Sequence, residues 1–167
     1  LAFARGEEGE QPVESNLTAI AQEATGHLAQ RTQLEFVGAA PVTMRLRPLA
    51  LKRAIANLGN NAADHAKKVR VTVSREAGEA VVIVEDDGPG IALELYEEAF
   101  KPFSRLDAAR NQNVSGVGLG LTIARDTARA HGGDVTLGKS SLGGLRAAIR
   151  LPLDMDAIGP AFGAMLG

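Results

Sequence analysis

Residues 68–91 read KVRVTVSREAGEAVVIVEDDGPGI, and the fold is decided in this stretch. Val69, Val71 and Val73 alternate with polar residues, which is typical of a strand with one buried face. An Ala-Gly-Glu turn separates them from a second apolar run at 80–85. Two such runs joined by a short turn predict a β-hairpin.

The second strand of this hairpin ends in three consecutive acids, Glu85, Asp86 and Asp87, which lead into a Gly-Pro-Gly turn. Strand alternation sends Glu85 to the face opposite Asp86, so Glu85 is expected in solvent. Asp87 is expected to cap the turn or to face solvent. The glycines allow a ligand to approach the backbone closely. An ordinary acidic turn is the alternative.

On both sides of the hairpin, apolar residues recur at helical or alternating spacing. The sequence predicts a two-layer α+β sandwich, in which helices cover one face of a mixed, largely antiparallel sheet of about five strands. This domain is expected to span 15–153, with 154–167 as a C-terminal tail. The predicted helices are 15–31, 48–65, 92–100 and 119–131. The other predicted strands are 134–137, 145–151 and a pair around a Gly-Ala-Ala-Pro turn, 34–37 and 42–46.

The composition excludes several classes of protein. The chain has 167 residues, of which 45% are hydrophobic, enough for one domain with a core. The net charge of -2 argues against a nucleic-acid binder, which usually carries a basic face. The absence of cysteine excludes disulfides and thiolate metal sites. No apolar run approaches the roughly 20 residues that span a bilayer.

Two segments carry candidate chemistry outside the hairpin. On the helix at 48–65, Asn57, Asn61 and Asp64 share one polar stripe. The side-chain amides there can offer a carbonyl oxygen to a hard cation and N–H donors to a phosphate. Plain solvated side chains are the alternative. The run GVGLGL at 116–121 leads into a helix, where free backbone amides favour phosphate. It lacks the Gly-Lys-Ser/Thr of a P-loop, and a flexible loop is the alternative.

Four motifs occur in order: NLGNNAADHA, EDDGPGI, FKPF and GVGLGL. Together they resemble the catalytic and ATP-binding domain of two-component sensor histidine kinases, especially the osmosensor type, within the ATPases related to gyrase, Hsp90 and MutL. The resemblance covers about Leu46 to Leu153. It implies a Bergerat-type ATP-binding fold, binding of ATP with Mg²⁺, and donation of the γ-phosphoryl group to a histidine on a separate dimerisation domain.

The resemblance also implies residue roles. Asn57 and Asn61 would be the catalytic residues, with Asn61 as the metal ligand and Asn57 on phosphate oxygens, while Asp86 would accept the adenine amine. The loop 104–117 would be the ATP lid, and Phe100 would anchor its base or belong to the core. The implied cofactor-binding residues are Asn57, Asn61, His65, Asp86, Gly88, Gly90, Ile91, Phe103, Arg110, Gly116, Gly118, Leu119, Gly120 and Leu121. Arg105 could contact a phosphate in place of Arg110, and the alternative is that both arginines are solvated loop cations.

Two positions modify this expectation. Asp64 stands where many family members carry Lys or Arg, and it would repel ATP unless it points away or is offset by Lys67 or Lys68. Asn57 stands where the ATP-hydrolysing relatives place a Glu that activates water. Because an amide cannot take that proton, slow hydrolysis is expected, with ATP held for transfer to a partner.

The histidines His27, His65 and His131 are not followed by an acid, as a phosphoacceptor histidine usually is. The resemblance therefore implies the ATP-binding half alone, with 1–14 as the end of a dimerisation helix and a linker. The expected partners are the dimerisation domain and a response regulator, without nucleic acid or membrane contact. The isolated chain is expected to be a monomer and to be cytoplasmic, as the cytoplasmic part of an inner-membrane sensor kinase. Alternatives are a degenerate nucleotide-binding or docking module, or an anti-sigma-type serine kinase.

Overall fold

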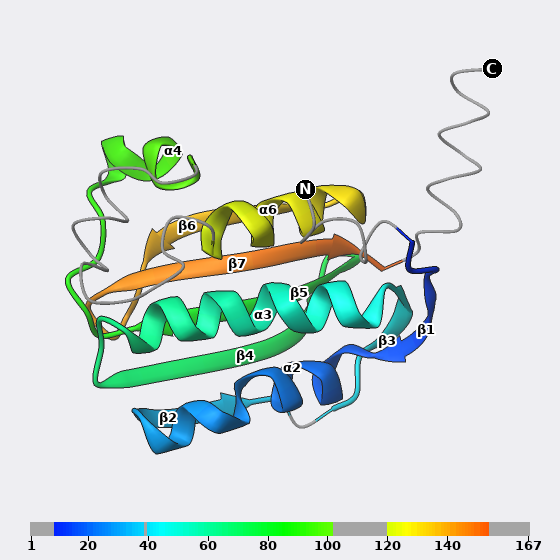
Figure 1. The fold of residues 1–167 in the computed structure, drawn as a ribbon, viewed down its shortest axis with the longest axis horizontal. Helices are drawn as coiled ribbons and strands as arrows, with labels where there is room; N and C mark the ends of the chain where they lie inside the picture. Colours follow the sequence, from blue (N-terminus) through cyan, green and yellow to red (C-terminus); the bar gives the residue numbers. More distant parts are fainter. Residues whose placement is uncertain (1–8, 39, 102–119, 154–167) are drawn as a thin grey trace.

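The computed structural model describes residues 9–38, 40–101 and 120–153, which form two sheets and a layer of helices (Figure 1). The larger sheet has five strands in the order β2-β4-β5-β7-β6, and the smaller pairs β1 with β3. The elements are β1 (Val13–Asn16), α2 (Leu17–Thr25), the 3-10 helix η1 (Gly26–Gln30), β2 (Gln33–Val37), β3 (Thr43–Leu46), α3 (Pro48–Ala63), β4 (Lys68–Glu76), β5 (Glu79–Asp86), the 3-10 helix η2 (Leu93–Leu95), α4 (Tyr96–Ala99), α6 (Gly120–Ala130), β6 (Asp134–Lys139) and β7 (Leu145–Pro152).

The predicted hairpin forms the middle of the larger sheet. β4 and β5 pair antiparallel, with Val71 opposite Val84, and they turn at Ala77 and Gly78, which both have positive φ. β7 pairs antiparallel with β5 and with β6, whereas β2 runs parallel to β4. The prediction of a mixed, largely antiparallel five-stranded sheet is confirmed.

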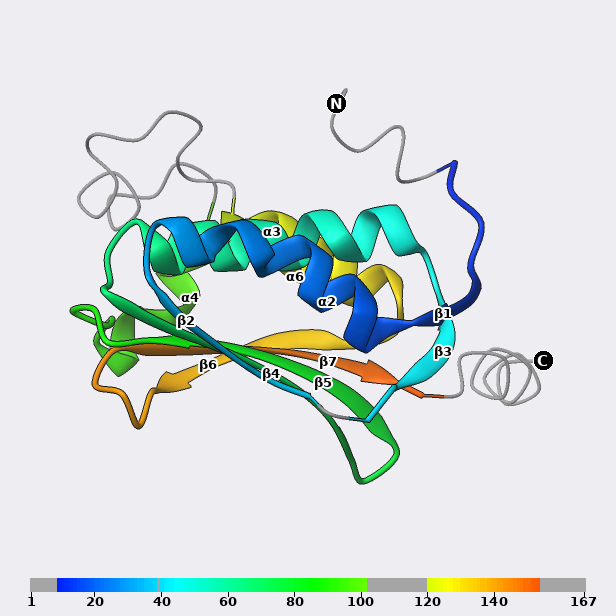
Figure 2. The same cartoon turned by 90° about the horizontal axis from the view of Figure 1, so that it is seen from below.

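Helices α2, α3 and α6 all lie on one face of this sheet (Figure 2). Val82 and Val84 of β5 point toward them and join the main core, while Val81 and Ile83 point to the other face and pack with Ala148 of β7. In the described ranges, the period of two along β5 therefore separates a face covered by helices from a face on which no helix lies. The predicted two-layer α+β sandwich is confirmed.

The N-terminal third differs from the sequence prediction. The strands expected around one turn belong to different sheets, because β2 pairs with β4 and β3 pairs with β1. Val13 and Glu14, expected in a linker, form part of β1. The helix predicted at 15–31 is shorter: Asn16 caps α2 by accepting a hydrogen bond from the Ala19 amide at 3.1 Å, and α2 gives way to η1 at Gly26.

The first turn of α3 is capped from outside the helix. Arg47 precedes Pro48 and supplies no side-chain cap. Instead the Glu10 carboxylate accepts from the backbone amides of Leu49 at 2.8 Å and Ala50 at 3.0 Å. A carboxylate here satisfies free amides and opposes the positive end of the helix dipole. The segment before β1 is thereby attached to α3.

A buried histidine completes this attachment. His131 Nε2 accepts from the Arg47 amide at 3.0 Å, and its Nδ1 donates to the Thr127 carbonyl at 2.8 Å. This pattern requires the neutral ring. Burial lowers the pKa of His131 and so favours that form.

Candidate functional site

Asn57 and Asn61 lie one turn apart on α3, where the beginning of α6 packs against it. A Cβ placed on Gly120 would lie 3.5 Å from the Asn57 carbonyl oxygen and 3.9 Å from Asn61 Cβ. Asn57 Nδ2 is buried and has no hydrogen-bond partner among the residues the structure describes. A buried amide donor costs free energy unless an acceptor meets it, so this atom fits an oxygen-rich ligand such as a phosphate.

The Asp86 carboxylate is held in a fixed orientation at the end of β5. The residue is 2% exposed. Its Oδ1 accepts from the amides of Gly88 at 2.9 Å and Leu145 at 3.2 Å. Two backbone donors from different segments stabilise the ionised carboxylate as a hydrogen-bond acceptor.

Gly144 makes this arrangement possible. Its amide donates to the Asp86 carbonyl at 2.9 Å, and a Cβ placed on it would lie 2.1 Å from Asp86 Oδ1. Any side chain at Gly144 would collide with the carboxylate. Gly90, with φ of 69°, lies beside the same glycine, with 3.5 Å between its ideal Cβ and the Gly144 carbonyl carbon.

The three consecutive acids have separate environments. Asp87 Oδ1 accepts from the amides of Lys67 and Lys68, both at 2.9 Å, and these bonds lower the pKa of Asp87, that of Lys68 most. It therefore binds the backbone at the start of β4, which is neither of the two expected roles, a cap of the Gly-Pro-Gly turn or a solvent-facing side chain. The expectation that Glu85 is solvated is wrong: it is 8% exposed and accepts from Ser140 Oγ at 2.9 Å.

The end of α3 contacts the loop after β5. A Cβ placed on Gly88 would lie 2.8 Å from the His65 carbonyl oxygen, so glycine is needed for this close approach. His65 itself is half-buried. The asparagines of α3 and the carboxylate of Asp86 are thus parts of one structural unit, with Ile91 packed against the core beyond the turn.

Asp64 is compensated by a cation that the sequence did not indicate. It forms an ion pair with Arg31, which follows η1, and its side chain is 11% exposed. The expected offset by Lys67 or Lys68 is therefore replaced by one from Arg31. Asn60, between the two candidate asparagines, points to the same neighbours, with its Oδ1 2.8 Å from His27 Nε2 and 3.4 Å from Arg31 Nη1.

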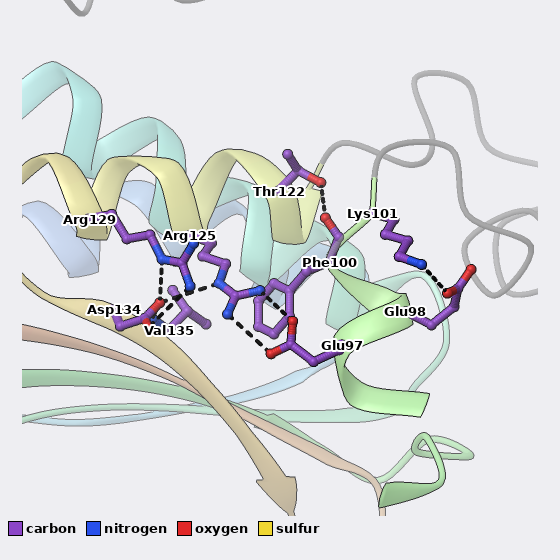
Figure 3. Close-up of polar contacts among 9 residues, drawn as sticks. All are labelled: Glu97, Glu98, Phe100, Lys101, Thr122, Arg125, Arg129, Asp134 and Val135. Carbon is purple, nitrogen blue, oxygen red and sulfur yellow. Dashed lines mark hydrogen bonds and ion pairs between the residues drawn. The ribbon is translucent and has the colours of Figure 1, made fainter. Parts of the chain in front are cut away.

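Helices α4 and α6 are joined by a cluster around Arg125 (Figure 3). Arg125 makes a bidentate ion pair with Glu97, at 3.1 Å for each bond, and its guanidinium lies 4.1 Å from the ring centroid of Phe100. The hydrogen bond with Arg125 lowers the pKa of Glu97. Thr122 Oγ1 also donates to the Phe100 carbonyl at 2.6 Å. Phe100 is a core residue and ties α4 to the beginning of α6.

The same cluster continues to β6. Arg125 Nε lies 3.4 Å from Asp134 Oδ1, and Arg129 Nε lies 3.2 Å from the same oxygen (Figure 3). The Val135 amide donates to this oxygen at 2.8 Å. The position of α6 is therefore fixed relative to both α4 and the sheet.

The structure brings together most of the predicted site residues that it describes. Asn57, Asn61 and Gly120 meet at the α3–α6 contact, Leu121 enters the core beside them, and His65, Gly88 and Asp86 meet at the end of β5. The remaining predicted residues lie outside the described part of the chain: Phe103, Arg105, Arg110, Gly116, Gly118 and Leu119.

Sequence reasoning missed three contributors, Arg31, Ser140 and Gly144. The pair of glycines at 143–144, placed after a strand, was a usable signal for close packing. Nothing local in the sequence identifies Arg31 or Ser140, whose partners lie 33 and 55 positions away.

Two further properties limit the possible chemistry. In the ranges that the structure describes, no three His, Asp or Glu side chains are grouped to hold a metal ion. No helix in those ranges has the length and apolar character needed to cross a membrane.

Comparison with known proteins shows the family to which the chain belongs. Residues 47–155 match the family described as histidine kinase-, DNA gyrase B-, and HSP90-like ATPase. The sensor histidine kinase GtrS of Pseudomonas aeruginosa is 45% identical over 121 residues, which are 72% of this chain and 24% of GtrS. The sensor protein RstB of Escherichia coli is 43% identical over 115 residues, 68% of this chain and 26% of RstB. The chain thus spans about a quarter of these relatives.

Solved structures show the same fold. The histidine kinase domain of the E. coli osmosensor EnvZ aligns with a TM-score of 0.65 and 35% identity, over 86% of this chain and 89% of that domain. The ATP-binding domain of PrrB from Mycobacterium tuberculosis aligns with a TM-score of 0.71 and 24% identity, over 86% of this chain and 98% of that one. The chain therefore belongs to the histidine kinase-, DNA gyrase B- and HSP90-like ATPase family, in the branch of the sensor histidine kinases.

Proposed function

We propose that this chain binds Mg-ATP and donates the γ-phosphoryl group to a histidine on a separate dimerisation domain. The observation that carries the proposal is the buried side-chain nitrogen of Asn57, which has no hydrogen-bond partner in the part of the chain that the structure describes. Asn57 lies beside the beginning of α6, within a unit that also fixes Asp86. An acceptor for a purine amine and a donor for phosphate oxygens then lie in one site. The named relatives, which are sensor kinases, support the same reading.

In this proposal each residue binds or orients a part of the nucleotide. Asp86 accepts the adenine amine, and Asn57 donates to phosphate oxygens together with the first amides of α6. The Asn61 carbonyl would hold Mg²⁺, which when bound neutralises charge on the phosphates. Transfer breaks the bond between the γ-phosphorus and the β–γ bridging oxygen, forms a phosphorus–nitrogen bond to the acceptor histidine, and releases ADP.

Asn57 cannot serve as a base for water, so the proposal includes slow hydrolysis in the absence of an acceptor. The rate of phosphoryl transfer to the acceptor histidine then depends on the positioning of ATP and on electrostatic stabilisation. The same proposal places the domain in the cytoplasm as part of a sensor kinase, with a response regulator as the next phosphoryl acceptor. It also takes the chain as a monomer when isolated, with a catalytic domain that begins at β1 and ends at 153, and with the residues before β1 as the connection to the dimerisation domain.

Calorimetric titration with Mg²⁺ and a non-hydrolysable ATP analogue tests binding, with Asp86→Asn as the control that should bind far more weakly. Transfer of labelled phosphate from ATP to a supplied dimerisation domain tests the reaction. The product should be labile in acid, as a phosphorus–nitrogen bond is, whereas an acid-stable product would indicate a serine kinase. Tight binding without transfer would favour a docking module, although the Arg31–Asp64 pair weakens the main motive for that alternative.

A further inference from the structure

The turn between β6 and β7 contacts both faces of the last residues of β5. Glu85 and Asp86 are neighbours on a strand, so their side chains point to opposite faces. Ser140 Oγ donates to Glu85 Oε1 at 2.9 Å on the face without helices. On the other face, the Leu145 amide donates to Asp86 Oδ1 at 3.2 Å. The strand end is therefore held between the two ends of one turn.

This turn is a small unit with its own hydrogen bonds. The Ser140 amide donates to the Gly144 carbonyl at 2.8 Å, and the Gly143 amide donates to the Ser140 carbonyl at 3.0 Å. The Leu142 amide donates to Ser140 Oγ at 2.9 Å. Ser140 is thus bonded to both ends of the turn, and a shift of its side chain displaces the amides at 144 and 145.

Glu85 is unusually buried for a charged residue on a strand face that no helix of the described residues covers. It is 8% exposed, as is Ser140. Its Oε2 lies 3.8 Å from Arg70 Nη1, and Arg70 is also bound to Glu35 at 2.7 Å. A buried carboxylate is costly unless it is paired and hydrogen-bonded. The Ser140 hydroxyl and Arg70 meet that need and fix the Glu85 side chain.

We propose that Ser140 and Glu85 are positioning residues that set the adenine selectivity of Asp86. The pair fastens the β6–β7 turn to the back of β5, and the turn then presents the Gly144 and Leu145 amides to Asp86 on the front. Without the pair, the turn relaxes and the carboxylate loses its fixed orientation. This inference rests on the proposed binding of ATP at Asp86.

The test compares ATP with inosine triphosphate, which carries a carbonyl oxygen in place of the adenine amine. The wild-type chain should prefer ATP, because the Asp86 carboxylate accepts from an amine and repels a carbonyl. Ser140→Ala should weaken ATP binding by about tenfold, the scale of one hydrogen bond to a charged group, and leave inosine triphosphate binding nearly unchanged. A merely structural loss would lower both affinities equally and keep their ratio.

Three further substitutions on the same unit complete the test, two of them as controls. Ser141→Ala changes the neighbouring, exposed serine of the turn and should keep the ATP preference. Glu85→Gln retains an oxygen that can accept from Ser140 and should keep most of the preference, whereas Glu85→Ala should lose it. If Ser140→Ala shows no cooperative melting transition, the Glu85→Gln and Glu85→Ala pair decides the question.

The outcomes separate the inference from the proposed function. Wild-type protein that binds neither nucleotide overturns both. Wild-type protein that prefers ATP, with a Ser140→Ala variant of unchanged ATP preference, overturns the inference and leaves the proposed function intact. An equal effect of Glu85→Gln and Glu85→Ala on the ratio also overturns it. The inference is supported if the ratio of ATP affinity to inosine triphosphate affinity falls in Ser140→Ala and Glu85→Ala but not in Ser141→Ala or Glu85→Gln.

Discussion

Arg31 and Asp64 form an ion pair at the end of α3, one turn beyond the candidate metal ligand Asn61. Removing the cation leaves an uncompensated negative charge near the proposed phosphate site. Arg31→Ala is therefore expected to weaken ATP binding about threefold at low salt and less at high salt, because ions screen exposed charges. Titration at two ionic strengths measures the effect.

The double variant Arg31→Ala/Asp64→Asn should recover the lost affinity, since it removes the repelling charge as well. Lys52→Ala is the matched control. It also removes a cation that pairs with an acid, but near the other end of α3, where Lys52 Nζ lies 3.9 Å from Glu23 Oε2 and both side chains are largely exposed. An equal loss in Lys52→Ala would show that net charge, and not the pair, sets the affinity.

Asn61 is expected to connect nucleotide binding to Mg²⁺. Chelation of the metal should weaken ATP binding in the wild-type chain by about tenfold or more, and Asn61→Ala should lose most of that metal dependence. Asn60→Ala, on the neighbouring position that contacts His27 and Arg31, should retain it. Equal metal dependence in all three proteins would remove Asn61 from the metal site.

Gly144→Ala should abolish adenine binding and destabilise the fold, because its Cβ would lie 2.1 Å from Asp86 Oδ1. We expect a loss of about 2 kcal/mol or more in the free energy of unfolding. Gly138→Ala is the matched control on β6, since nothing lies within 4 Å of the Cβ it would add. Urea unfolding of both variants measures the difference, and similar midpoints would contradict the packing described here.

The Arg125 cluster should hold α4 against α6. Arg125→Gln removes the guanidinium, and with it the two parallel hydrogen bonds to Glu97 and the positive charge over the Phe100 ring. The amides of α4 should then exchange hydrogen faster, while those of β4 and β5 keep their protection. Arg125→Lys keeps the charge but not the two parallel bonds and should give an intermediate rate. Uniform acceleration across the sheet would instead indicate global destabilisation.

Stability should fall as the pH is lowered from 7 toward 5, and His131 is the expected cause. Burial lowers the pKa of His131 in the folded chain below the unfolded value of about 6.5. Below that unfolded value the unfolded chain binds a proton that the folded chain resists, so the free energy of unfolding decreases until the folded pKa is passed.

Denaturation curves across this pH range measure the slope. His131→Gln should flatten it, at the cost of lower stability at pH 7, whereas His27→Gln changes an exposed ring and should leave it in place. The carboxylates with a lowered pKa, Asp87, Glu97 and Asp134, lose their contribution to stability only in more acidic solution and therefore do not affect this slope.

The elements that the sequence predicted well are those with a strong local pattern. The alternation at 69–73 identified β4, and the apolar face of 48–65 identified α3 to within two residues of its end. The short strand at 13–16 was missed because four residues carry little periodicity and its stability depends on pairing with β3. Pairing partners are a tertiary property, which also explains why β2 and β3 were placed together.

The site divides in the same way. Asn57, Asn61 and Asp86 belong to compact motifs, so a single segment of sequence was enough to select them. The burial of Glu85 could not be predicted, because strand alternation gives the face of a side chain but not what covers it. Its cover is Ser140, from a turn distant in the sequence. The functional roles of Asn57, Asn61 and Asp86 stay predictions, as do those of Phe103, Arg110 and the glycines at 116 and 118.

Helix α3 has Glu10 at one end and Asn61 close to the other. With 16 residues, it is a rod about 24 Å long. A helix of this length bends little, so a displacement of the segment before β1 would move α3, and the asparagines on it, as one rigid body. The attachment of that segment to α3 would therefore link its position to that of the proposed nucleotide-binding asparagines.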